Sequence, residues 1–272
     1  MVAKLANGRR SLFLVCAMAC ALVVVMAGCR SINTAAQKGD IATVERLLNR
    51  GRDPDQRNWR NSRPLLAASS SGHLAVVKLL VARGADIDRI GDTFQTALHH
   101  AAQIGHVEMV EFLLAHGANP KWGLNEAVRA GQVEVARVFL ARKVDIDQEG
   151  YGGGTPLQWA MARGNAELAK LLLTHGANAD LPASRGTTVL AAAAGHGQAE
   201  LVKLLLAHGA KVNAQGAYGR TPLHVAAWKD DVAIGRLLLK HGADPSLKCN
   251  GNSVQPRSAE FRALLVEYPT KR

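Results

Sequence analysis

The chain has 272 residues, with 33 lysines and arginines against 22 aspartates and glutamates, so its formal net charge at pH 7 is +11. A basic chain favours acidic partners such as nucleic acid, anionic lipid headgroups or an acidic protein surface. The sequence contains no recognised nucleic-acid-binding motif, phosphate-binding glycine loop or nucleophile elbow. The absence of these motifs therefore argues against a nucleic-acid partner and against the common classes of catalytic site.

Residues 1–28 are typical of a secretory signal. Three basic residues precede an apolar run over 12–25, which is too short for a comfortable membrane span, and small residues follow it. The tetrapeptide Met26-Ala27-Gly28-Cys29 resembles a bacterial lipobox, with Met26 in place of the commoner leucine. This resemblance implies that Cys29 is lipidated and becomes the N-terminus of the mature chain. An uncleaved signal anchor is the alternative.

Lipidation at Cys29 would place the protein in the bacterial cell envelope. Each buried methylene of an acyl chain contributes about 0.8 kcal/mol, so two or three long chains hold a protein durably on a bilayer. By analogy with enteric-type bacteria, Arg30 predicts the outer membrane, with the chain facing the periplasm; surface exposure is the alternative. Loss of the signal leaves a net charge of +8, and Cys249 as the one cysteine of the folded part. No disulfide within the chain is therefore expected.

Helix-ending glycines recur after the signal in steps of 33 residues with one interruption. They are Gly51, Gly84, Gly117, Gly176, Gly209 and Gly242. The missing marker falls on Lys143, one step of 26 residues after Gly117, so one repeat has lost seven residues. A period of this length repeats a whole supersecondary unit, which predicts a stack of similar modules.

The pattern predicts two helices in each module. In the fullest copy, Thr221-Pro222-Leu223-His224, the threonine caps the first helix, and the proline occupies a first turn that needs no N–H donor. An alanine pair, Ala226-Ala227, lets the next module approach closely. In an earlier module Gly72-His73 marks the turn, and the apolar spacing over 76–80 predicts a longer second helix that ends at a left-handed glycine.

This pattern resembles the ankyrin repeat over about residues 30–268. The resemblance implies an all-α solenoid of about seven repeats, with a C-terminal capping helix over 258–268. The repeat bodies are expected at roughly 30–58, 59–91, 92–121, 122–147, 148–183, 184–216 and 217–249. In the fourth repeat, Lys121-Trp122-Gly123-Leu124 replaces the usual hairpin and Thr-Pro pair, so we expect the hairpin to be absent there and to leave a notch.

The ten histidines do not indicate a metal site. Eight follow the capping leucine, follow the turn glycine or precede the terminal glycine, one repeat apart, where an imidazole can donate to free helix carbonyls. His100 and His196 fall outside these positions and form no ligand set. The fourth repeat brings Asn125, Glu126 and Arg129 together, but without a nucleophile and base at useful spacing. No metal, cofactor or catalytic residue is predicted.

In proteins that resemble ankyrin, the hairpin tips and the exposed side of the first helices form a concave binding face. Aromatic and basic residues of this chain gather in those segments, and these types dominate interface energetics. Trp159, in a first helix, belongs either to this face or to the packing between repeats. The predicted partner-binding residues are Trp59, Arg60, Arg129, Tyr151, Arg163, Arg185, Tyr218, Arg220, Trp228 and Lys229.

The sequence thus predicts a signal peptide over 1–28 and a repeat domain over 30–268. The predicted function is a non-catalytic protein–protein interaction module, anchored to the membrane by its N-terminal lipid. Its partner is expected to be a protein with an acidic surface, not nucleic acid or a small-molecule substrate. The alternatives are an immunity protein that neutralises a secreted toxin, and an envelope scaffold that binds anionic lipid.

Overall fold

The computed structural model describes residues 31–58, 62–91, 94–150, 153–182 and 186–268. Regular structure in these ranges is almost entirely α-helical, with two isolated β-bridges. The helices are α2 (Ile32–Gln37), α3 (Ile41–Asn49), α4 (Pro64–Ser70), α5 (Leu74–Ala82), α6 (Ala97–Ile104), α7 (Val107–Ala115), α8 (Gly123–Arg129), α9 (Val133–Ala141), α10 (Pro156–Ala162), α11 (Ala166–Thr174), α12 (Val189–Gly195), α13 (Ala199–Ala207), the short 3₁₀ helix η2 (Ala217–Gly219), α14 (Pro222–Lys229), α15 (Val232–Lys240) and α16 (Ala259–Glu267).

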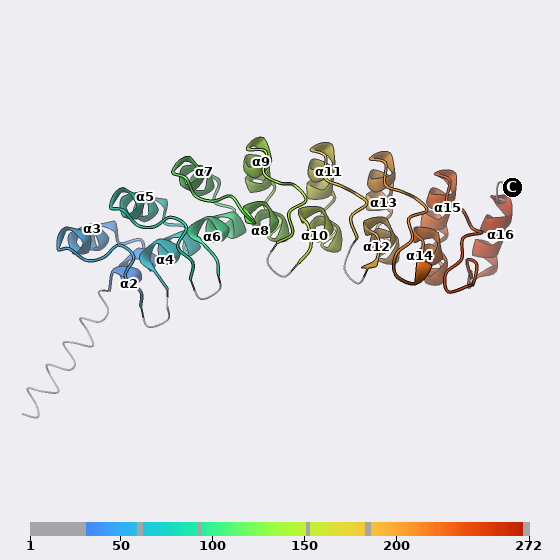
Figure 1. Cartoon of the computed structure of the whole chain (residues 1–272), viewed down its shortest axis with the longest axis horizontal. Helices are drawn as coiled ribbons and strands as arrows, with labels where there is room; N and C mark the ends of the chain where they lie inside the picture. Colours follow the sequence, from blue (N-terminus) through green and yellow to red (C-terminus); the bar gives the residue numbers. More distant parts are fainter. Residues whose placement is uncertain (1–30, 59–61, 92–93, 151–152, 183–185, 269–272) are drawn as a thin grey trace, which may run out of the picture. The chain divides into compact units, whose positions relative to one another are not determined.

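Each repeat contributes a shorter first helix and a longer second helix. Seven such pairs run from α2 and α3 to α14 and α15, and α16 follows alone. The chain divides into two compact units, one of residues up to 101 together with 108–119, the other of 102–107 together with 120 onward. In the first unit α3, α5 and α7 form one row, beside α2 and α4. In the second, α9, α11, α13 and α15 form one row, beside α8, α10, α12 and α14 (Figure 1). The predicted all-α repeat architecture is confirmed.

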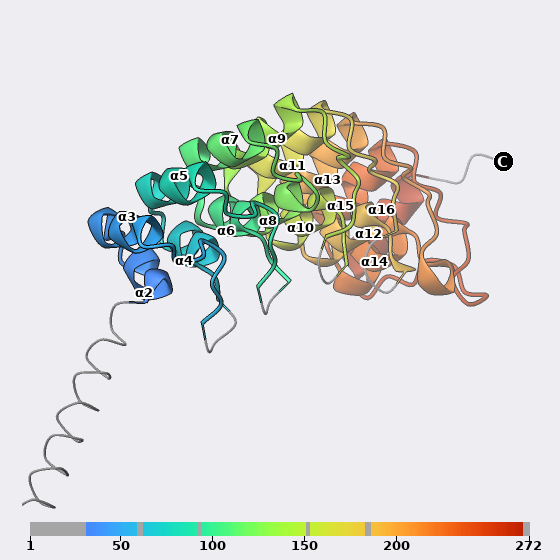
Figure 2. The same cartoon turned by 60° about the vertical axis from the view of Figure 1, so that its left-hand side comes forward.

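Loops join the second helix of one repeat to the first helix of the next. They run beside the row of first helices, as two views show for the loops before α14 and α16 (Figure 1, Figure 2). The first helices and these loops therefore lie on one side of a unit.

The first helices start where the Thr-Pro signal predicts. Thr155 and Thr221 are N-caps whose hydroxyls accept the N–H of the residue three positions on, and that residue's side chain binds back to the N–H of the cap. Thr188 caps α12 in the same way through the N–H of Ala191. A cap of this kind stabilises a helix by about 1 kcal/mol, so the motif fixes the start of each helix.

The second helices end where the glycine register predicts. All six marker glycines have φ between 78° and 90°. Lys143, which stands in the interrupted position, has φ 54° and so adopts the same left-handed conformation without glycine's freedom. The interruption therefore changes the residue and keeps the turn.

A ladder of short polar side chains ties neighbouring repeats together. Five aspartate or asparagine side chains each accept a backbone N–H from the residue 31 positions later, with shortest distances of 2.8–3.1 Å. They are Asp55, Asp88, Asp147, Asp180 and Asn213. Each bond lies within one unit. These side-chain oxygens thus help to stack the repeats, a role that was not predicted from the sequence.

The fourth repeat lacks its hairpin, as predicted. Trp122, with φ 64°, takes the place of a capping threonine and makes no side-chain cap for α8. A Cβ at Gly123 would collide with the ring of Phe139, which is fully buried. Gly123 is therefore needed for α9 to approach α8. The expected notch at this repeat stays a prediction.

Helix α16 ends the repeats as a single helix. Ser258 caps it by accepting the N–H of Phe261, and the Phe261 ring is fully buried against Gly235 of α15. Within the described residues, no helix has the length and apolar character needed to cross a membrane.

Candidate partner-binding groove

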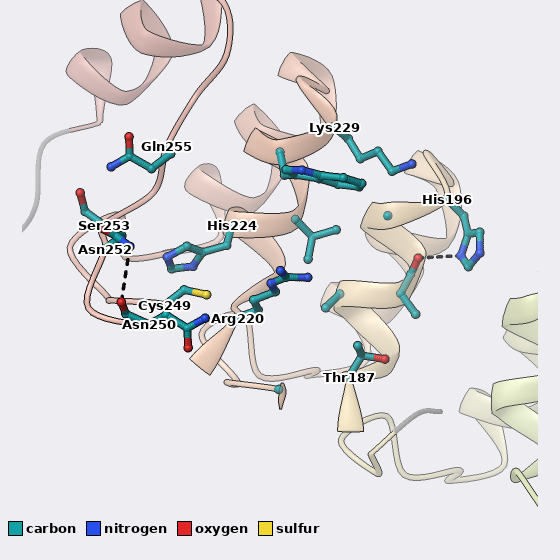
Figure 3. A pocket seen from close by; sticks show the side chains of 16 residues that line it. Thr187, His196, Arg220, His224, Lys229, Cys249, Asn250, Asn252, Ser253 and Gln255 are labelled. Atoms are coloured by element: carbon teal, nitrogen blue, oxygen red, sulfur yellow. Dashed lines mark hydrogen bonds between the residues drawn. The ribbon is translucent and has the colours of Figure 1, made fainter. Parts of the chain in front are cut away.

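Two hollows flank α12 in the second unit. The larger, about 640 Å³, lies between α12, α14 and the loop over 249–255 (Figure 3). The smaller, about 180 Å³, lies between α10 and α12. Thr187, Ala192 and His196 line both hollows. We call the two together the α12 groove, with an α14 pocket and an α10 hollow.

Small side chains on α12 create the groove. The helix reads Val189-Leu190-Ala191-Ala192-Ala193-Ala194-Gly195, and two of its alanines and its glycine line the α14 pocket. One repeat later, the positions equivalent to Ala191, Ala192 and Gly195 hold His224, Val225 and Trp228. The sixth repeat thus leaves empty the volume that its neighbour fills with an imidazole, a branched side chain and an indole.

The α14 pocket is electrostatically one-sided. Arg220 and Lys229 line it, both exposed, and within the part of the chain that the structure describes neither belongs to an ion pair. Neither aspartate nor glutamate is among the residues that line either hollow. Two positive charges with no carboxylate among the lining residues favour an anionic ligand group.

Two histidines also line the pocket, and hydrogen bonds orient both. The N–H of Thr221 donates to Nδ1 of His224 at 3.3 Å, as part of the cap of α14. Burial lowers the pKa of His224, with Arg220 acting in the same direction and the backbone of Asn252 opposing it. His224 is therefore neutral at pH 7. His196 donates from Nδ1 to the carbonyl of Ala192 at 2.8 Å and so serves the end of α12.

Trp228 forms an exposed aromatic wall beside the pocket. Its side chain is 57 % exposed. Lys229 Nζ lies 5.1 Å and Arg257 Cζ 5.2 Å from the centre of its ring, which is within cation–π range. Trp228 therefore combines exposed aromatic area with adjacent positive charge, which suits an acidic partner.

The structure brings three of the predicted binding residues together: Arg220, Trp228 and Lys229 all line the α14 pocket. Tyr218 lies in the loop before α14, 72 % exposed with φ 64°, but does not line the pocket. Arg163 is exposed at the end of α10 and lines neither hollow.

Arg129 has a structural contact. Its Nη2 donates to Oε2 of the buried Glu126 at 2.6 Å, so its guanidinium is already engaged within α8. Trp159 is half-buried and donates from Nε1 to the carbonyl of Gly153. The remaining predicted residues, Cys29, Trp59, Arg60, Tyr151 and Arg185, lie outside the described residues.

Sequence reasoning missed other parts of the surface. It did not place Cys249 or the loop around Asn252 at a pocket, and it overlooked Phe94, which is 57 % exposed with φ 56° in the first unit. The run of alanines in α12 was a readable signal, because the neighbouring repeats carry larger residues at the same positions.

Most histidines serve helix ends, as the sequence predicts. His116, His175 and His241 each donate from Nδ1 to the carbonyl four residues earlier at 2.8 Å. Among the described residues, no three His, Cys, Asp or Glu side chains cluster in a way that could hold a metal ion.

Comparison with known proteins identifies the fold family. A model of ankyrin repeats matches three stretches, residues 32–122, 124–216 and 176–249, and the chain belongs to the ankyrin repeat family. The crystal structure of the human ASB11 ankyrin repeat domain is similar, with 29% sequence identity and a TM-score of 0.69, over 79% of this chain and 98% of that one. No curated protein matches the chain. Ankyrin repeat domains are typically non-enzymatic scaffolds for protein–protein interaction, and the chain has this architecture.

Proposed function

We propose that this protein is a membrane-tethered binding module of the bacterial envelope, which grips an acidic protein partner through the α12 groove. The observation that carries the proposal is the α14 pocket, where Arg220 and Lys229 stand beside Trp228 without a lining carboxylate. Arginine and tryptophan dominate binding energy at interfaces because they combine large buried area with directional contacts. The family supports a protein as the partner.

The tether in this proposal is a lipid on Cys29. Its support is the sequence Met26-Ala27-Gly28-Cys29 after a basic and apolar leader. We expect metabolic labelling with a radioactive fatty acid to mark the wild-type protein, and a Cys29→Ser variant to lose both the label and its membrane association. An unlabelled wild-type protein would contradict the lipid anchor. It would not bear on binding through the α12 groove, which is tested separately.

The groove is tested by crosslinking in intact envelopes followed by capture of the tagged full chain. The variant Arg220→Glu/Lys229→Glu reverses both pocket charges. The matched control, Lys170→Glu/Lys240→Glu, makes the same change on exposed lysines of the second helices α11 and α15. We expect the control to retain a protein partner that the pocket variant loses, and the wild-type complex to weaken as salt rises.

A partner retained by both variants would refute recognition through this pocket. Binding to anionic vesicles that only the pocket variant loses, without any protein partner, would favour the lipid-scaffold alternative.

A further inference from the structure

The two hollows of the α12 groove differ in chemistry. The α10 hollow is lined mainly by apolar groups, among them Met161, Ala162, Val189 and Ala193, and carries no lysine, arginine or carboxylate. The α14 pocket carries Arg220 and Lys229. A ligand that fills both hollows therefore needs an apolar group on one side of α12 and an anionic group on the other.

From this arrangement we infer that the groove recognises an extended segment of the partner in which an apolar side chain and an acidic side chain stand three residues apart. The apolar side chain enters the α10 hollow, and the carboxylate meets Arg220 and Lys229 in the α14 pocket. This inference rests on the proposed function and specifies the partner's chemistry.

The spacing follows from the width of one helix. Packed helices lie about 8–10 Å apart, so hollows on either side of α12 are separated by about that distance. In a polyproline II segment, every third residue returns to the same face after about 9 Å, since the rise is about 3.1 Å per residue. A β-strand brings side chains to one face after about 7 or 13 Å, which fits less well. A spacing of three in a polyproline II conformation matches the groove best.

A small side chain, that of Ala192, lies between the two hollows on this face of α12. Ala192 lines both of them, while Trp159 and Val225 hold the equivalent positions one repeat before and one repeat after. A larger residue is therefore compatible with the helix pair at this position. Because the sixth repeat has alanine at this position, one extended segment can pass over Ala192 and reach both hollows.

The first test measures binding of synthetic peptides to the purified full chain in detergent by fluorescence polarisation. The peptides consist of proline and alanine with one leucine and one glutamate, two, three or four positions apart and in both orders. We expect the spacing of three to bind at least about tenfold more tightly, because a misplaced carboxylate loses a charged hydrogen bond. Equal affinity at all spacings, or a preference for two or four, would overturn the inference.

Two variants make the test specific. Ala192→Leu should obstruct both hollows and weaken the best peptide about tenfold or more, whereas Ala233→Leu, on the exposed face of α15, should leave it unchanged. Arg220→Glu/Lys229→Glu should prefer a peptide with lysine in place of glutamate at the same spacing. Failure of this reversal would count against the α14 pocket as the carboxylate site.

The outcomes separate the inference from the proposed function. If crosslinking depends on Arg220 and Lys229 while the peptides show no preferred spacing, the binding module stands and the motif is wrong. If a helical peptide with the two groups seven residues apart binds best, the extended conformation is refuted.

Discussion

Loss of the Arg129 side chain should destabilise the protein far more than its place at the surface suggests. Glu126 is 3 % exposed, and its carboxylate accepts from Arg129 at 2.6 Å, while Arg129 itself is 35 % exposed. Removing one partner of a buried ion pair costs about 3–5 kcal/mol, because the other charge stays buried alone. Since water reaches part of Arg129, we expect Arg129→Ala to cost roughly 2–3 kcal/mol.

The chain offers a matched control in the next helix. Arg137 and Glu134 form an ion pair at the same spacing, 3.4 Å apart, with both side chains at least half exposed. Arg137→Ala should cost about 0.3–0.5 kcal/mol or less through this pair. The difference is measured by urea denaturation followed by circular dichroism. In thermal unfolding, Arg129→Ala should lower the Tm by about 4–12 °C, at 2–4 °C per kcal/mol.

Equal stability of the Arg129→Ala and Arg137→Ala variants would contradict a buried ion pair between Arg129 and Glu126. In the background of Glu126→Gln, where no buried charge is left behind, the cost of Arg129→Ala should shrink to about 1 kcal/mol or less. A variant that keeps its stability but loses a crosslinked partner would instead support the predicted binding role of Arg129.

Three further predictions concern the repeats. Lys143→Gly should stabilise the protein by about 0.5–1 kcal/mol in urea denaturation, because relief of left-handed strain outweighs the extra conformational entropy of glycine in the unfolded chain. Gly176→Lys should destabilise it by a similar amount. Nothing lies within 4 Å of a Cβ added at Gly176, so the left-handed strain acts there without a steric clash. Gly123→Ala should cost about 1–3 kcal/mol through collision with Phe139, and a thermal unfolding midpoint equal to that of the wild type would contradict this packing. Burial lowers the pKa of His224, so the unfolded chain binds a proton at this histidine more readily than the folded chain does. The stability that the neutral imidazole contributes is therefore present above about pH 6.5 and is lost as the pH falls below that value. His224→Gln should lose less thermal stability than the wild type between about pH 7 and pH 5.5.

The starts of the first helices and the ends of the second helices were predictable because their causes are local. A threonine before a proline makes a cap for its own helix, and a glycine at the required φ ends a helix whatever surrounds it. The same locality explains the absent hairpin of the fourth repeat, since Trp122 and Gly123 stand where the cap and the proline would be. The predicted binding residues were chosen by residue type and segment. The structure brings Arg220, Trp228 and Lys229 together at the α14 pocket, and their role in binding stays a prediction.

What the sequence by itself determined is thus the repeat, its period, its helix ends and the sign of its charge, because each depends on residues close together in the chain. The tertiary structure decided which side chains share a space. It placed Arg129 against a buried glutamate, and it used five short polar side chains to tie repeats together. It also opened the α12 groove beside alanines that in sequence look like ordinary packing residues. These outcomes depend on distances between residues about one repeat apart, or on which face of a helix is buried, and both are fixed only when the repeats stack.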